Sequence, residues 1–193
     1  GFRESNLRKK TYVYSLIGTN CFNRTGSYKT HKSLSDECRL RFFPGNHDWA
    51  NEQLLEQGML HVFGGVILAN KSLEPYKKHY LPALKGLTDR LKEETPWESY
   101  YLAKLGSQID ERYEKGYFDK MATKLADNPK VELALKAEKD IEKLCSMFYE
   151  KYTYHSGDRD DKPKRTEKGE ELAKPYADIP HGELLKKLGQ KCK

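Results

Sequence analysis

The chain has 193 residues, of which 37% are apolar and 33% are charged, and its formal net charge is +6. This length suffices for a hydrophobic core without a partner, and the sequence excludes a transmembrane helix because no run approaches the roughly 18 apolar residues that one needs. The mean hydropathy of -0.89 predicts that part of the chain contributes little to a core.

The net charge is concentrated in the first quarter of the chain. Residues 1–47 hold nine cations and three anions, so the remainder is formally neutral. The nine cations are Arg3, Arg8, Lys9, Lys10, Arg24, Lys29, Lys32, Arg39 and Arg41. Aromatic residues are interleaved with them, and such a segment can follow a phosphate backbone, lie on an anionic membrane or meet an acidic protein face. We therefore predict a basic arm that contacts an anionic surface, with RNA, anionic lipid and an acidic subunit as the alternatives.

Two short strands are predicted within this arm. Residues 11–18 are rich in aromatic and β-branched side chains, and residues 38–43 alternate apolar with basic side chains. Residues 23–37 between them are polar, which is typical of a loop. The two strands are expected to form a small antiparallel ribbon beside a helical body.

The sequence PGNHDW follows the second strand at residues 44–49. It resembles the Gly-Asn-His-Asp signature of calcineurin-like metallophosphoesterases, and this resemblance implies that Asn46 is a metal ligand and that His47 stabilises the transferring phosphoryl group. The other parts of that signature are missing or out of order, because the chain has no Asp-x-His and no Gly-His-x-His, and its Gly-Asp-x-x-Asp at residues 157–161 follows the block instead of preceding it. The interpretation we favour is a Pro-Gly turn that leads into a helix capped by Asp48.

Residues 48–154 show helical periodicity and form the predicted body. The first helix is expected over residues 48–65, with Met59 on its buried face. A second helix is expected over residues 72–94, with a kink or break at Pro82, because proline lacks the backbone N–H that a helix interior uses.

The clearest helix start in the sequence is TPWE. Thr95 is placed to cap the helix, Pro96 occupies its first position and Glu98 completes a capping box. The periodicity behind it predicts one long helix over residues 95–126, and a second helix over residues 129–152 follows after a short turn. Helices joined in this way are expected to pack as an antiparallel pair. The predicted fold class is therefore mainly α, an antiparallel helix pair or small helical bundle with a short β-like N-terminal region and extended terminal arms.

Residues 155–193 form a polar C-terminal segment with proline at positions 163, 175 and 180. Little in this segment can be buried before residue 183, so we expect an extended tail with a short helix over residues 183–189. The predicted organisation is thus an N-terminal arm over residues 1–47, a helical body over residues 48–154 and this tail.

The four cysteines are Cys21, Cys38, Cys145 and Cys192, and no pair has the CxxC spacing typical of a zinc site. They allow two disulfides with three possible pairings, and Asn23 and Asn70 each begin an N-glycosylation sequon. These features favour an alternative in which the chain is a secreted helical binding protein stapled by disulfides.

No sequence motif assembles a catalytic site. The chain has no P-loop, no dinucleotide-binding glycine pattern, no G-x-S-x-G and no HExxH, so we expect no cofactor and no metal, and the enzyme alternative rests on Asn46 and His47. We predict a non-catalytic accessory or structural subunit of a larger multi-protein complex, bound to neighbouring subunits through its arms. The basic start favours an organellar, mitochondrial location, with secretion as the alternative.

Overall fold

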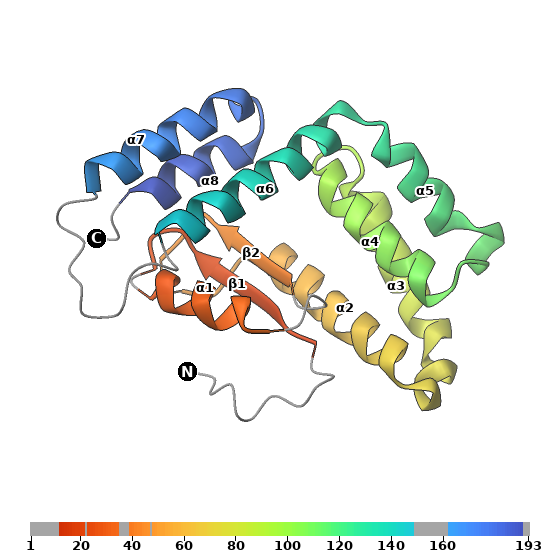
Figure 1. Cartoon of the computed structure of the whole chain (residues 1–193). Helices are drawn as coiled ribbons and strands as arrows, with labels where there is room; N and C mark the ends of the chain where they lie inside the picture. Colours follow the sequence, from red (N-terminus) through yellow and green to blue (C-terminus); the bar gives the residue numbers. More distant parts are fainter. Residues whose placement is uncertain (1–11, 22, 35–38, 47, 149–161, 191–193) are drawn as a thin grey trace. The chain divides into compact units, whose positions relative to one another are not determined.

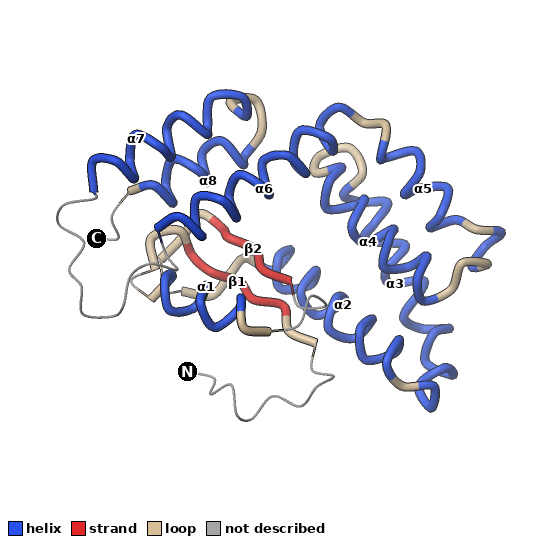
Figure 2. The backbone as a smooth tube through the Cα atoms, in the orientation of Figure 1, coloured by secondary structure: helices blue, strands red, loops and turns tan. Residues whose placement is uncertain are grey.

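The computed structural model describes residues 12–21, 23–34, 39–46, 48–148 and 162–190 (Figure 1). The chain divides into two compact units: unit 1 contains Gly1–Asn51 and Lys136–Lys193, and unit 2 contains Glu52–Leu135. Helices dominate the described residues, and the strands form one small sheet (Figure 2). The prediction of a mainly α protein with a short β region near its N-terminus is confirmed.

The sheet of unit 1 consists of β1 (Tyr14–Gly18) and β2 (Arg39–Phe43). Both strands were expected, but they pair in parallel, with Tyr14 opposite Arg39 and Gly18 opposite Phe43, so the predicted antiparallel ribbon is wrong. Parallel strands need a crossover connection, and a helix usually provides it. The segment predicted as a loop accordingly contains α1 (Arg24–Lys32).

Helix α1 forms because tertiary packing outweighs its weak helix propensity. Its sequence RTGSYKTHK contains glycine, serine and two threonines, all poor helix formers. Arg24 and Tyr28 lie one turn apart on its inner face and are each only 2% exposed, and burial of one face commonly stabilises a helix more than propensity does.

Gly18 permits a close approach between the end of β1 and the loop that follows β2. A Cβ atom at this position would lie 2.0 Å from the carbonyl oxygen of Asn46 and 2.6 Å from that of Gly45. The backbone N–H of Asn20 donates a hydrogen bond of 2.8 Å to the Gly45 carbonyl oxygen. Any larger residue at position 18 would displace this loop.

The helical part of unit 1 comes from the second half of the chain. It comprises α6 from Lys136 onward (α6 spans Pro129–Phe148), α7 (Lys162–Ala173), the 3-10 helix η4 (Lys174–Tyr176) and α8 (Pro180–Gly189). The inner face of α6 buries Ala137, Ile141, Leu144, Cys145 and Phe148, as its periodicity predicts.

Helices α7 and α8 pack against each other. The sequence predicts only residues 183–189 of this hairpin as helical, and the expectation of extended structure over α7 is wrong. Glycines explain why a helix hairpin forms where the sequence predicts an extended tail. A Cβ atom on Gly169 would lie 2.9 Å from the Leu185 carbonyl oxygen and 3.0 Å from the Gly189 Cα atom. The two backbones therefore meet with few large apolar side chains between them, which gives the sequence little hydrophobic periodicity.

Unit 2 is a helical bundle with a core of leucine and aromatic side chains. Its elements are α2 (Glu52–Ala69), η2 (Lys71–Tyr76), α3 (Lys77–Leu91), α4 (Pro96–Ile109), η3 (Tyr113–Lys115) and α5 (Tyr117–Ala126), followed by the first turns of α6. The core cluster is formed by Ile67, Tyr80, Leu81, Leu84, Leu87, Leu91, Leu102, Leu105, Ile109 and Phe118. Helix α4 packs against both α3 and α5.

The predicted continuous helix over residues 95–126 is wrong, because the backbone reverses between α4 and α5. Glu114, Lys115 and Gly116 have positive φ angles of 43°, 61° and 80°, a conformation that no right-handed helix contains. The reversal brings α5 onto α4, where a Cβ atom on Gly106 would lie 2.4 Å from the Phe118 ring. Helix α4 thus packs against its two neighbours in sequence instead of forming the expected long pair.

Two further expectations for unit 2 concern the ends and the continuity of its helices. Helix α3 is not broken at Pro82. Because Pro82 and Lys78 are both exposed, water can reach the carbonyl group that the proline leaves without a helical partner. The expected bounds of the first helix are wrong. Helix α2 begins at Glu52, not Asp48, and passes through the predicted end at residues 64–65.

Candidate functional site

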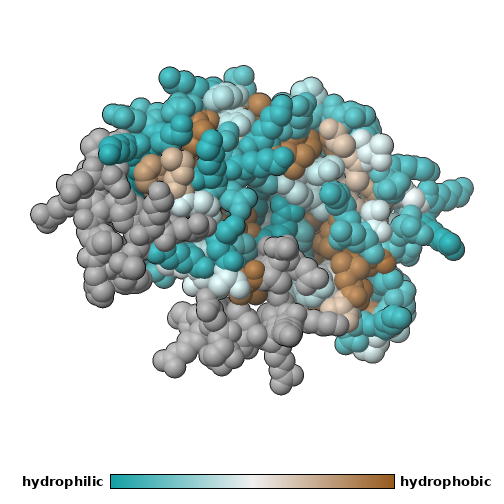
Figure 3. All heavy atoms as spheres, in the orientation of Figure 1, coloured by the Kyte–Doolittle hydropathy of each residue, from teal (hydrophilic) through white to brown (hydrophobic). Residues whose placement is uncertain are grey.

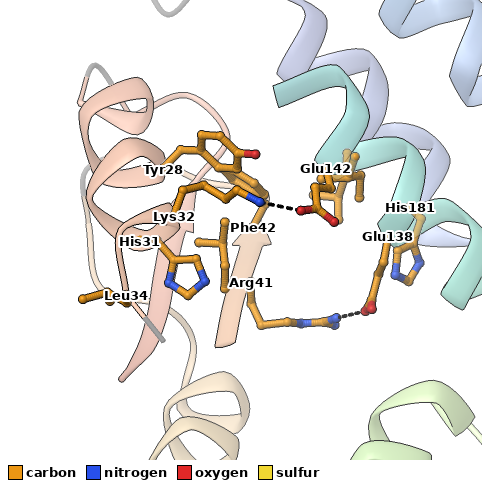
Figure 4. A pocket seen from close by; sticks show the side chains of 12 residues that line it. Tyr28, His31, Lys32, Leu34, Arg41, Phe42, Glu138, Glu142 and His181 are labelled. Carbon is orange, nitrogen blue, oxygen red and sulfur yellow. Dashed lines mark hydrogen bonds and ion pairs between the residues drawn. The ribbon is translucent and has the colours of Figure 1, made fainter. Parts of the chain in front are cut away.

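Unit 1 contains a cavity of about 370 Å³ bordered by α1, β2, α6 and α8 (Figure 4). Its two charged walls have opposite signs. Lys32 of α1 and Arg41 of β2 form the cationic wall. Glu138 and Glu142 lie one turn apart on α6, so the helix directs both carboxylates toward the opposite wall.

Two ion pairs connect these walls. Lys32 Nζ lies 2.6 Å from Glu142 Oε1, and Arg41 lies 2.6 Å from Glu138 Oε1. The first pair is at the solvent edge, with side chains 41% and 59% exposed, whereas those of the second are only 12% and 27% exposed. The inner pair is therefore less screened by water and contributes more to holding the walls together.

Two imidazoles also line the cavity, and both favour the neutral form. His31 Nδ1 lies 3.2 Å from Ser15 Oγ, and burial together with the nearby Lys32 charge lowers the pKa of His31. His181 is 2% exposed, and burial, reinforced by Arg41, lowers its pKa to about 4 despite the opposing effect of Glu138. A base with so low a pKa is poorly matched to proton transfer near pH 7.

The cavity therefore presents paired charges and neutral imidazoles to a bound molecule. Its two carboxylates are engaged by cations, and its imidazoles are neutral hydrogen-bonding groups. Among the residues that the structure describes, no group of three or more histidine, cysteine, aspartate or glutamate side chains could hold a metal ion.

Arg24 is buried, although the sequence predicts that it lies on the surface with the other basic residues. It is 2% exposed, so it offers no surface to an anionic partner and that part of the prediction is wrong. Its guanidinium donates hydrogen bonds to the backbone carbonyl oxygens of Thr19, Lys187, Leu188 and Gln190. Three of these carbonyls lie at the end of α8, where a cation also compensates the negative end of the helix dipole.

The other predicted basic residues fall into three groups. Lys32 and Arg41 belong to the cavity, and Lys29 and Arg39 are partly exposed. The remaining four, Arg3, Arg8, Lys9 and Lys10, lie outside the described residues. Contact between the basic arm and an anionic surface stays a prediction.

The residues of the two alternative functions are only partly described. Asn46 is exposed, and His47 lies outside the described residues. The thiols of Cys21 and Cys145 are buried, and Cys38 and Cys192 lie outside the described residues. Within the second sequon the Asn70 side chain is exposed and accepts a hydrogen bond of 3.0 Å from the backbone N–H of Ser72. The metallophosphoesterase and disulfide hypotheses therefore stay predictions.

Helix α2 presents an apolar surface that the sequence does not predict. Its outward side chains Met59, Phe63 and Val66, called the α2 stripe below, are 59%, 56% and 39% exposed. Hydrophobic side chains are visible at the surface in the part of the view occupied by α2 and α3 (Figure 3). The expectation that Met59 faces the core is wrong.

Glycines explain why α2 has this orientation. A Cβ atom on Gly64 would lie 2.4 Å from Tyr80 Oη and 2.9 Å from Leu105 Cδ2. The face of α2 that carries Gly64 therefore packs inward, and Met59, Phe63 and Val66 face outward. Gly58, Gly64 and Gly65 are all buried, and their presence in an apolar helix is the sequence signal for this arrangement.

None of the helices in the described part of the chain is both long and apolar enough to cross a membrane. Comparison with known proteins gives no match to a family model, a curated protein or a solved structure.

Proposed function

We propose that this protein is a non-catalytic accessory subunit of a larger protein assembly and that it binds a protein partner through the α2 stripe. The observation that carries the proposal is the exposure of three consecutive large apolar side chains on one helix face. Exposed apolar surface costs about 25 cal/mol per Å² relative to burial, and contiguous patches of this kind usually mark interaction sites.

The packing of unit 2 supports an external partner for this surface. Helix α2 cannot bury the stripe by rotating about its axis, because the glycine face already contacts Tyr80 and Leu105 at distances that exclude a Cβ atom. Rotation would also expose Ile67, which belongs to the core cluster. A second molecule can cover the stripe without disturbing that core.

Site-specific photo-crosslinking tests the proposal. A benzophenone amino acid replaces Phe63 in one variant and the exposed Lys124 of α5 in a matched control. After irradiation in the native source we expect protein adducts from position 63 that position 124 does not give. Equal adduct patterns from the two positions, or no adducts from position 63, would refute an interface at the stripe.

The cavity of unit 1 supports a second candidate function, binding of a small zwitterionic ligand. A cationic wall faces an anionic wall across it, so a ligand with one positive and one negative group could replace both ion pairs at once. Isothermal titration with a panel of free amino acids tests this candidate. We expect the wild type to bind at least one amino acid and Arg41→Gln to lose this binding. If no amino acid gives a heat of binding, this ligand class is rejected.

A further inference from the structure

The α2 stripe belongs to a longer seam with coiled-coil spacing. Along the outer face of α2 and its C-terminal end, exposed or half-exposed residues alternate at intervals of four and three positions. They are Glu52, Glu56, Met59, Phe63, Val66 and Asn70, called the α2 seam below. Alternation of this kind keeps one side of a helix facing a second helix along its whole length.

Charge is segregated along the α2 seam. Glu52 and Glu56 lie at its beginning, and the seam has no Asp, Glu, Lys or Arg from residue 57 to residue 70. Lys71 follows immediately, and both Glu52 and Lys71 are exposed. The seam thus has the exposed carboxylate of Glu52 at one end, an apolar middle, and the exposed cation Lys71 directly after its other end.

We infer that the partner at this surface is a second copy of the same chain, paired antiparallel through α2. In a two-fold symmetric pair the apolar middle meets its own counterpart, and the acidic end of each copy lies beside the basic end of the other. A parallel pair would instead place like charges together at both ends. The inference rests on the proposed role of the α2 stripe as an interface and names its occupant.

The surface beside the α2 seam has room for a second helix. Arg90 of α3 pairs with Glu56 of α2, which places this face of α3 along the seam. Ala83 and Gly86 lie two turns and one turn before Arg90 on the same face, both are exposed, and a Cβ atom on Gly86 would meet no atom within 4 Å. Small side chains of α3 thus border the large side chains of the stripe. The 18 residues of α2 give a second helix a surface about 27 Å long to pack against.

Sedimentation velocity of the full chain over a wide range of concentrations tests the pairing. We expect a reversible dimer that Phe63→Glu weakens more than about thirtyfold in dissociation constant, the loss typical of a central anchor. Lys124→Glu changes charge at an exposed position on α5 and serves as the control, which should dimerise like the wild type. Circular dichroism and melting temperature establish that each variant is folded.

A charge exchange tests the antiparallel orientation. Glu52→Lys and Lys71→Glu each place like charges together at both ends of a homodimer, so each variant alone is expected to dimerise about fivefold more weakly, whereas an equimolar mixture forms heterodimers with wild-type affinity. Both end contacts in that heterodimer join opposite charges. A mixture that dimerises no better than its components would overturn the antiparallel pairing.

The two proposals fail in different ways. A wild-type chain that stays monomeric at every concentration overturns self-pairing. If position 63 then crosslinks to other proteins in the native source, the assembly function stands and a different chain covers the stripe. If the wild type dimerises and position 63 crosslinks only to a second copy, self-pairing stands, and a native source that yields only this dimer, with no other chain bound, would overturn the role as a subunit of a multi-protein complex.

Discussion

Arg24 of unit 1 has a buried guanidinium group directed at backbone carbonyls, whereas Phe63 of unit 2 is a large apolar side chain exposed on the α2 stripe. In unit 1, Arg24 joins the end of α8 to the segment after β1 through hydrogen bonds. In unit 2, Leu84 and Leu102 are at most 1% exposed while Phe63 is 56% exposed. The difference teaches that unit 1 includes a buried polar centre in its packing, whereas α2 of unit 2 exposes the apolar stripe that we propose as an interface.

The largest expected effect is on unit 1. Arg24→Leu removes the donors to four buried or partly buried carbonyls, and we expect the free energy of unfolding of unit 1 to fall by about 3 to 5 kcal/mol. Arg24→Lys keeps the charge but not the planar fork, so an intermediate loss is expected. Hydrogen exchange measured separately on peptides of the two units checks the result, and equal loss of protection in unit 2 would argue against a local role.

Unit 2 offers a matched pair of apolar truncations. Leu84→Ala creates a cavity in the core cluster and is expected to cost about 3 kcal/mol. Met59→Ala removes a side chain that is 59% exposed, so in the monomer it should change stability by less than about 0.5 kcal/mol. Urea denaturation at a concentration where the chain is monomeric measures both. A large loss from Met59→Ala would place that side chain in the core.

Acidification should weaken unit 1 selectively. The pKa of His181 is lowered to about 4 in the folded state, so the unfolded chain binds the proton more readily between about pH 6.5 and pH 4 and stability is lost as pH falls through this window. The difference in proton binding predicts that the contribution of His181 to the free energy of unfolding falls by about 2 kcal/mol between pH 7 and pH 5.

His181→Gln has no imidazole to protonate and is the control for this effect. Comparison of the two proteins removes the contribution of carboxylates that titrate in the same window. Parallel pH profiles for the wild type and His181→Gln would contradict the buried neutral imidazole.

The smallest expected effects come from the two ion pairs of the cavity. A double-mutant cycle on Arg41 and Glu138 should give a coupling free energy of about 1 kcal/mol, because this pair is largely shielded from water. The cycle on Lys32 and Glu142, which are 41% and 59% exposed, should give less than about 0.5 kcal/mol. Equal couplings, or a larger value for the outer pair, would show that shielding does not distinguish them.

Local signals predicted several elements of the fold correctly. Both strands follow from their composition, the stripe of α6 follows from its period, and Pro96 marks the first residue of α4. The predicted capping box at the start of α4 is wrong, because the Thr95 side chain makes no capping hydrogen bond. Glu98 accepts a hydrogen bond from the Trp97 ring, and within the described structure Thr95 Oγ1 is buried without a hydrogen-bond partner.

The remaining features depend on contacts between residues far apart in the chain. Nothing near Arg24 in the sequence indicates that its partners are the carbonyls at the end of α8, more than 160 positions away. The α2 stripe is hidden for a related reason. Periodicity assigns large apolar residues to the core, but in α2 Gly64 packs against Tyr80 and Leu105, and Met59, Phe63 and Val66 face outward.

Native mass spectrometry of the protein purified gently from its source tests the central claim most directly, with wild type and Phe63→Glu compared side by side. The account predicts that the wild type leaves the column in an assembly that contains a second copy of the chain, and that Phe63→Glu loses this copy while still folded. A wild-type protein found only as a single chain, or a Phe63→Glu variant that keeps every neighbour of the wild type, would contradict the claim that the α2 stripe is an assembly interface.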